Sequence, residues 1–248
     1  MLILAIDSTA KISSAALLRD GTPLGEVTLN TGNTHSETLL PSVEFLLSSA
    51  RLTVADIDVF ACAVGPGSFT GVRIGAATIK GLAFGRGQCC AAVGTLEALA
   101  ERAADMRGIV VPVMDARRDQ VYTAVFDCAD CTPRRLTPDD AMSVDELGEL
   151  LTSHSAASGI DTAGRMIYFV GDGYDLVHDR LASKLPNIAD TPRDLRDHSA
   201  LSAARAAHRR LASGELTLND AGTLSPTYLR LSQAEREYNE KHKNDQNT

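Results

Sequence analysis

The sequence predicts an α/β protein of two related lobes, because one order of elements occurs twice along the chain. In the first half, three β-rich runs precede a helical pattern, a fourth strand and a second helical pattern. The second half repeats this β-β-β-α-β-α order in outline but less regularly, so we expect a reduced second lobe. A chain of 248 residues is long enough for two domains of roughly 100 to 130 residues.

The first half contains the clearer copy of this order. Asp20-Gly21 is a strong hairpin signal, and apolar residues recur at helical spacing after Ser36. The expected elements are strands Leu2–Ile6, Ser13–Leu18 and Gly25–Leu29, helix Ser36–Ala50, strand Val59–Val64, helix Thr70–Phe84, strand Ala91–Val93 and helix Thr95–Ala104.

The second half is interrupted by a polar segment, 128–165, which we expect to be rich in loops. Around it we expect strands Ile109–Met114 and Val121–Phe126, helix Val144–Leu151, strand Met166–Val170, helix Asp175–Leu185 and helix Ser199–Ala212. The predicted organisation is a first lobe over 1–105, a second lobe over 106–197, a segment of about 198–232 that returns to the first lobe, and a disordered tail over 235–248.

Composition excludes several classes of protein. Hydrophobic residues make up 44% of the chain and charged residues 23%, with a net charge of −8, which excludes a disordered or membrane protein. Six Phe, five Tyr and no Trp disfavour a stacking platform for single-stranded nucleic acid. The apolar N-terminal run ends at Asp7, too early for a signal peptide. Five cysteines, among them the lone Cys128–Cys131 CxxC pair, suit a reducing compartment, so we expect a cytoplasmic protein.

Two aspartates stand at matching places in the two halves. Asp7 and Ser8 follow the first strand of the first half, and Asp115 follows the first strand of the second half. This is the layout by which actin, Hsp70 and sugar kinases hold a nucleotide between lobes, so Asp7, Ser8 and Asp115 are candidate nucleotide-binding residues of a degenerate cleft. The alternative is that both aspartates cap turns by bonding to nearby backbone amides.

The segment Gly65–Gly75 reads GPGSFTGVRIG and is unlike the familiar phosphate loops in its spacing. Neither Gly65 nor Gly67 has the glycine five residues on that a Walker loop needs, and the third glycine comes one residue late for a dinucleotide fingerprint. Pro66 removes the GxSxG pattern of a hydrolase nucleophile. An anion-binding turn between a strand and a helix remains possible.

The helix after this loop is apolar on two faces. Gly71, Gly75, Gly81 and Gly85 fall on one face with Ile74, Thr78 and Leu82, whereas Val72, Ala76, Ile79 and Ala83 form a second face. Each glycine inside the helix costs about 1 kcal/mol relative to alanine, so close approach of another backbone is the natural compensation. We expect one face to pack on the sheet of the first lobe and the glycine face to meet a neighbouring helix, either within the chain or in a partner.

These motifs together resemble the TsaB family, also called YeaZ. The resemblance rests on ILAIDST at the N-terminus, HSETLLP from His35, GPGSFTGVRIG, the turn Asp115-Ala116-Arg117-Arg118 and PTYLR from Pro226. It is strong over about residues 1 to 125, faint from 128 to 200 and local again near Pro226. The family implies an actin-like, Hsp70-like and sugar-kinase-like fold of the ribonuclease H-like class.

The resemblance also implies a function. Such proteins are the non-catalytic, activating partner of a catalytic paralogue, TsaD, and of an ATPase, TsaE, in the bacterial complex that makes N6-threonylcarbamoyladenosine at position 37 of tRNAs reading codons that begin with adenine. Such proteins can also pair with themselves through the same surface, which leaves a monomer and a homodimer both open for the free chain. tRNA would be met through the complex. We expect no tightly bound cofactor in this chain, with ATP and Mg²⁺ used by the complex. The partner interface implied on the first-lobe helices comprises Leu39, Val43, Leu46, Gly71, Ile74, Gly75, Thr78 and Leu82.

Two other functions remain as alternatives. An ATP-dependent phosphotransferase would use Asp7 and Asp115, but Gly171-Asp172-Gly173 is the only candidate for an adenosine loop. A metal-dependent, glycoprotease-like peptidase would need a metal site. No pair of histidines stands four residues apart in the sequence, so the helical nucleus of such a site is missing. We therefore expect no metal, with His35 as a helix-start or interface residue.

Overall fold

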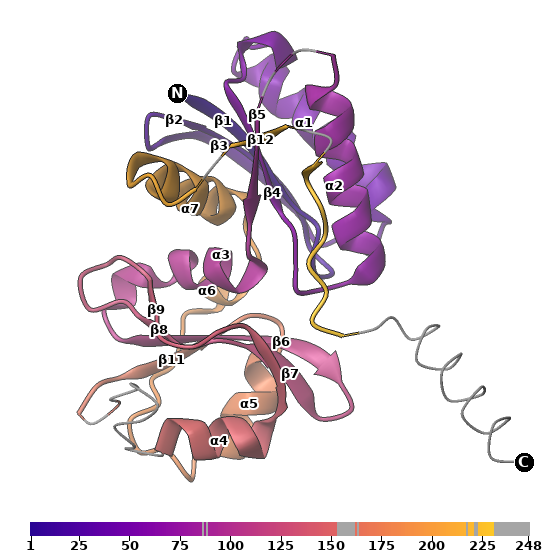
Figure 1. The fold of residues 1–248 in the computed structure, drawn as a ribbon. Helices are drawn as coiled ribbons and strands as arrows, with labels where there is room; N and C mark the ends of the chain where they lie inside the picture. Colours follow the sequence, from indigo (N-terminus) through magenta and orange to yellow (C-terminus); the bar gives the residue numbers. More distant parts are fainter. Residues whose placement is uncertain are drawn as a thin grey trace, which may run out of the picture.

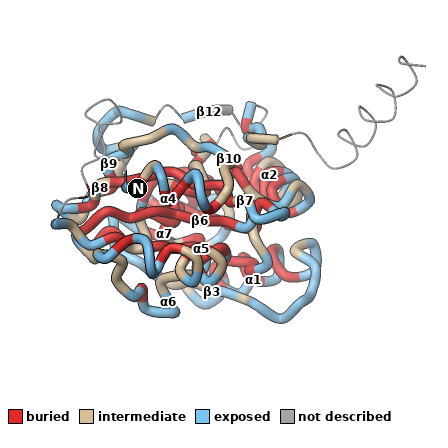
Figure 2. Tube along the Cα trace, turned by 90° about the horizontal axis from the view of Figure 1, so that it is seen from below, coloured by how far each residue is buried: buried red, intermediate tan, exposed pale blue. Residues whose placement is uncertain are grey.

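The structure, a computed structural model, describes residues 1–85, 87, 89–152, 162, 164–216, 218–220 and 223–230. Two β-sheets lie one above the other, and helix α3 (Thr95–Arg102) and the short helix α6 (Arg193–Arg196) lie between them (Figure 1). Each sheet forms the centre of one lobe, and buried residues concentrate in the strands (Figure 2).

The sheet of the first lobe has the strand order β12-β5-β4-β1-β2-β3. β1, β2 and β3 form an antiparallel meander, β4 and β5 continue the sheet parallel to β1, and β12 closes it antiparallel to β5. The strands are β1 (Leu2–Asp7), β2 (Ser13–Arg19), β3 (Thr22–Leu29), β4 (Val59–Ala63), β5 (Cys89–Val93) and β12 (Asn219–Asp220).

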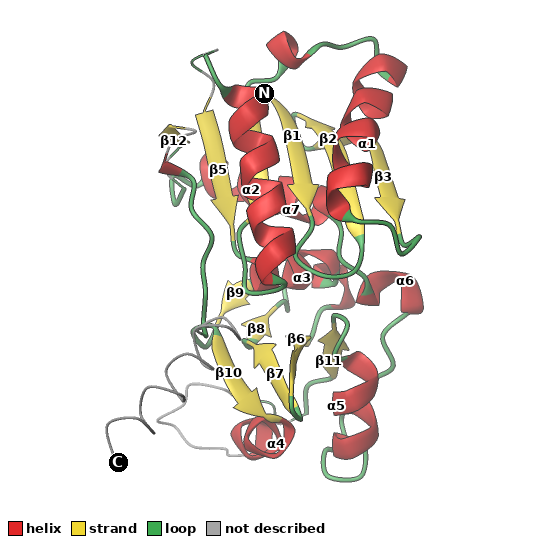
Figure 3. Cartoon of the chain, turned by 90° about the vertical axis from the view of Figure 1, so that its right-hand side faces the viewer, coloured by secondary structure: helices red, strands yellow, loops and turns green. Residues whose placement is uncertain are grey.

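Helices cover both faces of this sheet, because its central strands are apolar on both sides. Leu4 and Ile6 of β1 pack with α1 (His35–Ser49) and α2 (Phe69–Ala83), which lie side by side on one face (Figure 3). The alternate residues Ile3 and Ala5 pack with α7 (Ala200–Ala212) on the other face. The buried residues of α7 are small, which brings the helix close to the strands.

The second lobe repeats the first four strand positions. β7 and β8 both pair antiparallel with β6, with Tyr122 opposite Met114 and Phe126 opposite Val110, so they are two parts of one interrupted strand. β9 and β10 pair with these two parts in the same way, and β11 lies parallel to β6. The elements are β6 (Ile109–Arg117), β7 (Gln120–Thr123), β8 (Phe126–Asp127), β9 (Arg134–Arg135), β10 (Asp140–Ser143), α4 (Val144–Thr152), β11 (Ile167–Val170) and α5 (Tyr174–Leu181).

The strand order of the first lobe is 3-2-1-4-5, with β12 added at its edge. In the second lobe the order is 3-2-1-4, and a single parallel bridge between Ile188 and Ile167 of β11 takes the place of a fifth strand. The repeated order and the reduction of the second lobe are confirmed. The expected loop over 128–165 is wrong in part, because β9 and β10 lie within it. Both are short and exposed or half-buried, so they lack the apolar alternation that identifies a strand.

Smaller differences concern the ends of helices. The helix expected over Asp175–Leu185 ends at Leu181, and two 3₁₀ turns, Val54–Asp56 and Ala104–Met106, join neighbouring elements. The expected tail over 235–248 lies outside the described residues. Within the described part of the chain, no helix is both long and apolar enough to cross a membrane.

Candidate functional site

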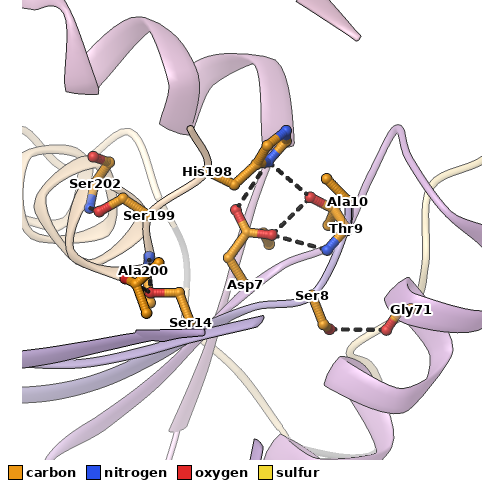
Figure 4. Close-up of polar contacts among 12 residues, drawn as sticks. Asp7, Ser8, Thr9, Ala10, Ser14, Gly71, His198, Ser199, Ala200 and Ser202 are labelled. Atoms are coloured by element: carbon orange, nitrogen blue, oxygen red, sulfur yellow. Dashed lines mark hydrogen bonds and ion pairs between the residues drawn. The ribbon is translucent and has the colours of Figure 1, made fainter. Parts of the chain in front are cut away.

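Asp7, the last residue of β1, is enclosed by polar partners from its own chain. Its Oδ1 accepts hydrogen bonds from the Thr9 backbone N–H at 2.9 Å and the Thr9 hydroxyl at 2.7 Å. His198 Nδ1 lies 3.5 Å from Asp7 Oδ2 and 3.3 Å from Thr9 Oγ1 (Figure 4). The Asp7 and His198 side chains are only 1% and 2% exposed. The carboxylate that could hold a magnesium-bound phosphate therefore faces an imidazole instead.

Charge explains why this buried pair is stable. Burial by itself would raise the pKa of Asp7, but the hydrogen bond and charge of His198, together with the bonds from Thr9, outweigh burial and lower it. Burial would likewise lower the pKa of His198, yet the hydrogen bond and charge of Asp7 raise it. Each residue thus favours the charged form of the other, and the His198 ring lies where a cation beside Asp7 would otherwise be. His198 Nε2 is buried without a hydrogen-bond partner among the described residues.

The turn after β1 is also closed from the side of α2. The Ser8 hydroxyl donates a hydrogen bond of 2.9 Å to the Gly71 carbonyl (Figure 4). A Cβ at Gly71 would lie 1.9 Å from the Ser8 carbonyl oxygen, and one at Gly75 would lie 2.6 Å from Ser8 Oγ. Gly71 therefore makes room for the Ser8 backbone, and Gly75 makes room for the Ser8 side chain. The prediction that they face a partner is wrong.

Asp115 differs from Asp7 in exposure but makes the same local bond. Its Oδ1 accepts a hydrogen bond of 2.7 Å from the Arg117 N–H, two residues further on, as Asp7 accepts from Thr9. Asp115 is exposed at the β6–β7 hairpin, and its backbone N–H donates to Asp172. No described hydrogen bond or ion pair joins Asp7 to Asp115. The turn-capping interpretation is confirmed for both aspartates, and a nucleotide role for them stays a prediction.

The candidate adenosine loop packs tightly against β6. Gly171 has a φ of +113°, and a Cβ there would lie 2.2 Å from the Val113 carbonyl oxygen. The Gly173 N–H donates a hydrogen bond of 3.0 Å to the same carbonyl. Both glycines of the loop are thus explained by close contact with the neighbouring strand.

Most of the predicted interface residues belong to the core of the first lobe. Leu39, Val43 and Leu46 are at most 5% exposed and pack in the cluster beneath α1 and α2. These three residues do not belong to an exposed interface, because the apolar stripe of α1 covers the sheet of its own lobe. Gly71 and Gly75 of α2 are excluded as well, because both are buried against Ser8. Ile74, Thr78 and Leu82 are half-buried and remain available at the edge of the predicted interface.

The outer surface of the same two helices carries apolar residues that the sequence analysis did not select. Leu40 and Phe45 of α1 are 44% and 62% exposed, and Phe84, directly after α2, is 82% exposed. Ala77 and Gly81 are exposed on α2. We call these five residues the outer face. In the sequence, these residues fall outside the apolar spacing that marks the buried side of each helix, and that pattern could have identified them.

The segment 223–230, which contains PTYLR, is a second feature whose role the sequence analysis missed. The Thr227 N–H donates a hydrogen bond of 2.7 Å to the Val64 carbonyl, and a Cβ at Gly65 would lie 2.3 Å from the Thr227 oxygen. The first glycine of GPGSFTG therefore serves this contact. Among the described residues, no three His, Cys, Asp or Glu side chains gather into a possible metal site, and His154 and His242 lie outside them.

Comparisons with known proteins agree with this architecture. Residues 25–238 match a family model described as "TsaD: tRNA N6-adenosine threonylcarbamoyltransferase". The Bacillus subtilis tRNA threonylcarbamoyladenosine biosynthesis protein TsaB is 30% identical over 98% of this chain and 100% of its own length. The Escherichia coli protein of the same name is 38% identical over 51% of this chain and 55% of its own length.

Solved structures show the same fold. YeaZ from Pseudomonas aeruginosa is 27% identical and superposes with a TM-score of 0.72, covering 92% of this chain and 99% of its own. A second Pseudomonas aeruginosa structure, described as similar to the peptidase YeaZ, is 26% identical with a TM-score of 0.74 and the same coverage. Together with the repeated strand order, this likeness confirms the predicted α/β fold of two related lobes, which the chain shares with the YeaZ structures.

Proposed function

The chain belongs to the TsaB family, and from this membership we propose that it is the non-catalytic, activating subunit in bacterial synthesis of threonylcarbamoyladenosine on tRNA. It takes part in that biosynthesis by binding a TsaD-like catalytic paralogue through the outer face of α1 and α2. A TsaE-like ATPase joins the pair, and tRNA meets the chain through the assembled complex in the cytoplasm.

The observation that carries this proposal is the contrast between a closed Asp7 site and an open apolar surface. Leu40 and Phe45 on α1 and Phe84 directly after α2 are large apolar side chains exposed on two neighbouring helices. Covering a large apolar side chain contributes about 1.5 to 3 kcal/mol. Three such residues on adjacent elements therefore supply much of the free energy that a specific interface requires.

The shape of the outer face suits helix-to-helix docking. Ala77 and Gly81 are separated by one helical turn and have no bulky side chain, so a partner helix can approach α2 closely there. Apart from Gly81's two chain neighbours and the nearby backbone of α2 itself, no described atom lies within 4 Å of a Cβ built at Gly81. The exposed rings of Phe45 and Phe84 would pack against the partner helix on either side of Ala77 and Gly81. A second copy of the chain would use the same surface when the paralogue is absent.

Chemistry at Asp7 is disfavoured by the same geometry. A nucleotide kinase needs its carboxylate free to hold a metal ion, whereas Asp7 faces His198 Nδ1 at 3.5 Å and accepts two hydrogen bonds from Thr9. We therefore propose that the isolated chain holds ATP and Mg²⁺ weakly or not at all. Micromolar ATP binding by the isolated chain, abolished in Asp7→Asn, would instead favour the phosphotransferase alternative.

Reconstitution tests the proposed function. Purified paralogue and ATPase should modify tRNA in the presence of this chain and lose most of that activity without it. The Phe45→Glu variant should fail to restore the activity, because it places a charge in the apolar interface. Met166→Glu is the matched control, since Met166 is 46% exposed in the second lobe. Full activity without the chain, or turnover by the chain alone, would contradict the proposal.

A further inference from the structure

The segment 223–230 connects the two lobes a third time. The chain first passes from the first lobe to the second after α3, through Ala104–Met106, and returns through α6 to α7. The third crossing lies on the edge of the molecule opposite α6, as both side views show (Figures 1 and 3). A rotation that separates the lobes about the α6 connection would therefore open the structure first at this third crossing.

The beginning of the segment is fixed to the first lobe. Leu224 is 1% exposed in the core beneath α1 and α2. The Tyr228 ring stacks on Phe69 with a centroid distance of 4.7 Å and an angle of 10°. Arg73 Nε donates a hydrogen bond of 2.8 Å to the Tyr228 hydroxyl, and its guanidinium carbon lies 5.5 Å from the Tyr228 ring centroid. Stacking on Phe69 and the contacts with the Arg73 guanidinium both fix Tyr228 against α2.

The end of the segment is fixed to the second lobe. Leu229 packs against the cluster between the lobes, which includes Tyr122. The Arg230 guanidinium donates to the Ala116 carbonyl at 3.3 Å and to the Gln120 side-chain oxygen, and it lies 5.9 Å from the Tyr122 ring centroid. Its three partners all belong to the β6–β7 hairpin that also carries Asp115. Only Leu229 thus lies between the anchor in one lobe, Tyr228, and the anchor in the other, Arg230.

We propose that residues 227–230 form a clasp that fixes the angle between the lobes and links the docking helix α2 to the β6–β7 hairpin. Arg73 makes this link, because it lies one turn before Ala77 on the exposed side of α2 and bonds to Tyr228. A partner that covers α2 removes the water competing for Arg73 and strengthens its bond to Tyr228. Docking therefore tightens the clasp. The link to docking rests on the proposed function, whereas the clasp itself does not.

Distances between the lobes in the free protein test the clasp. Spin labels are placed at Ser213→Cys, on the face of the first lobe away from α1 and α2, and at Asp179→Cys in the second lobe. Both positions are exposed, and Cys89→Ser and Cys131→Ser remove the partly exposed native thiols. Dilution with unlabelled chain excludes distances between copies. We expect one narrow distance distribution, and a broader one extending to longer distances in both Arg230→Ala and Tyr228→Ala.

Arg134→Ala is the control, because Arg134 is an exposed second-lobe arginine paired with Asp127 and outside the clasp. It should leave the distribution narrow. Distributions in Arg230→Ala and Tyr228→Ala that match the parent protein would overturn the clasp, and so would an equal broadening in Arg134→Ala.

Hydrogen exchange of the hairpin amides tests the link to docking. Saturating paralogue should slow exchange over residues 116–123 at least threefold in the parent protein and leave it unchanged in Tyr228→Ala. Paralogue binding without slower exchange would overturn the link but not the proposed function. Absence of paralogue binding would overturn the proposed function and the link together, while the distance measurement still decides the clasp.

Discussion

The inner and outer sides of α2 differ in how much of each is buried by contacts with the rest of the chain. On the inner side, Gly71 and Gly75 close on the Ser8 backbone and hydroxyl, and Asp7 pairs with His198 just beyond. On the outer side, Ala77, Gly81 and the adjacent Phe84 face solvent. A single helix thus packs closely on the turn after β1 with one side and leaves small and apolar residues exposed on the other. Inner substitutions should therefore cost stability, and outer substitutions should cost binding.

The largest loss of stability is expected for His198→Ala. Removing one member of a buried ion pair leaves Asp7 as an uncompensated buried charge, which costs about 3 to 5 kcal/mol. Chemical denaturation measures the free energy of unfolding. Lys184→Ala is the matched control, because the Lys184–Asp145 pair is 52% and 61% exposed and such pairs contribute about 0 to 1 kcal/mol. Equal losses in the two variants would show that Asp7 and His198 are not charged.

A smaller loss is expected for Gly71→Ala. The new methyl group would lie 1.9 Å from the Ser8 carbonyl oxygen, so the turn after β1 or the start of α2 must move. Overpacking of this kind costs about 3 kcal/mol, at the upper end of its usual range. The measurement is the denaturant midpoint. A variant as stable as the parent protein would mean that α2 does not approach Ser8 this closely.

The stability of the inner side should also depend on pH. Because the folded pKa of His198 is raised above 6.5, its stabilising contribution is complete below about pH 6.5 and is lost as the pH rises through the folded pKa. The difference in unfolding free energy between the parent protein and His198→Gln should therefore be largest below about pH 6.5 and shrink as the pH rises above it. Denaturation curves at several pH values measure it. A difference that grows with pH would contradict a raised pKa for His198 in the folded protein.

The smallest effect is expected on the outer side. Apart from its chain neighbours and the nearby backbone of α2, Gly81→Ala meets no described atom within 4 Å and removes a helix-interior glycine, so it should stabilise the free chain by up to about 1 kcal/mol. Gly81→Ala and Gly71→Ala are the same substitution in one helix with opposite expected signs. Thermal denaturation of both variants in parallel measures this difference, and destabilisation by Gly81→Ala would show that the outer side is packed.

Local patterns in the sequence predicted the fold well. The spacing of apolar residues identified α1 and α2, and the repeat was marked by two aspartates, which the structure places at or near the ends of β1 and β6. The third strand of the second lobe was missed, since Arg134–Arg135 and Asp140–Ser143 gain their strand geometry only from pairing with β7 and β8. Tertiary pairing, rather than local preference, defines those residues as strands.

The site was harder to predict than the fold. The glycine pattern indicated close backbone contact, but a helical wheel does not say whose backbone makes that contact, and Ser8 is 63 residues away from Gly71. Likewise, the sequence around His198 contains no signal for its pairing with Asp7, which joins residues 191 apart in the chain. Such long-range partners become apparent only when the elements are assembled.

The affinity of the purified catalytic paralogue for the outer face tests the central claim most directly. Isothermal calorimetry should show binding of the parent chain and of Met166→Glu with the same dissociation constant. Phe45→Glu should bind about 100-fold more weakly, equivalent to about 2.7 kcal/mol, with an unchanged free energy of unfolding. Equal affinity of Phe45→Glu and the parent chain would contradict the assignment of this surface as the docking site.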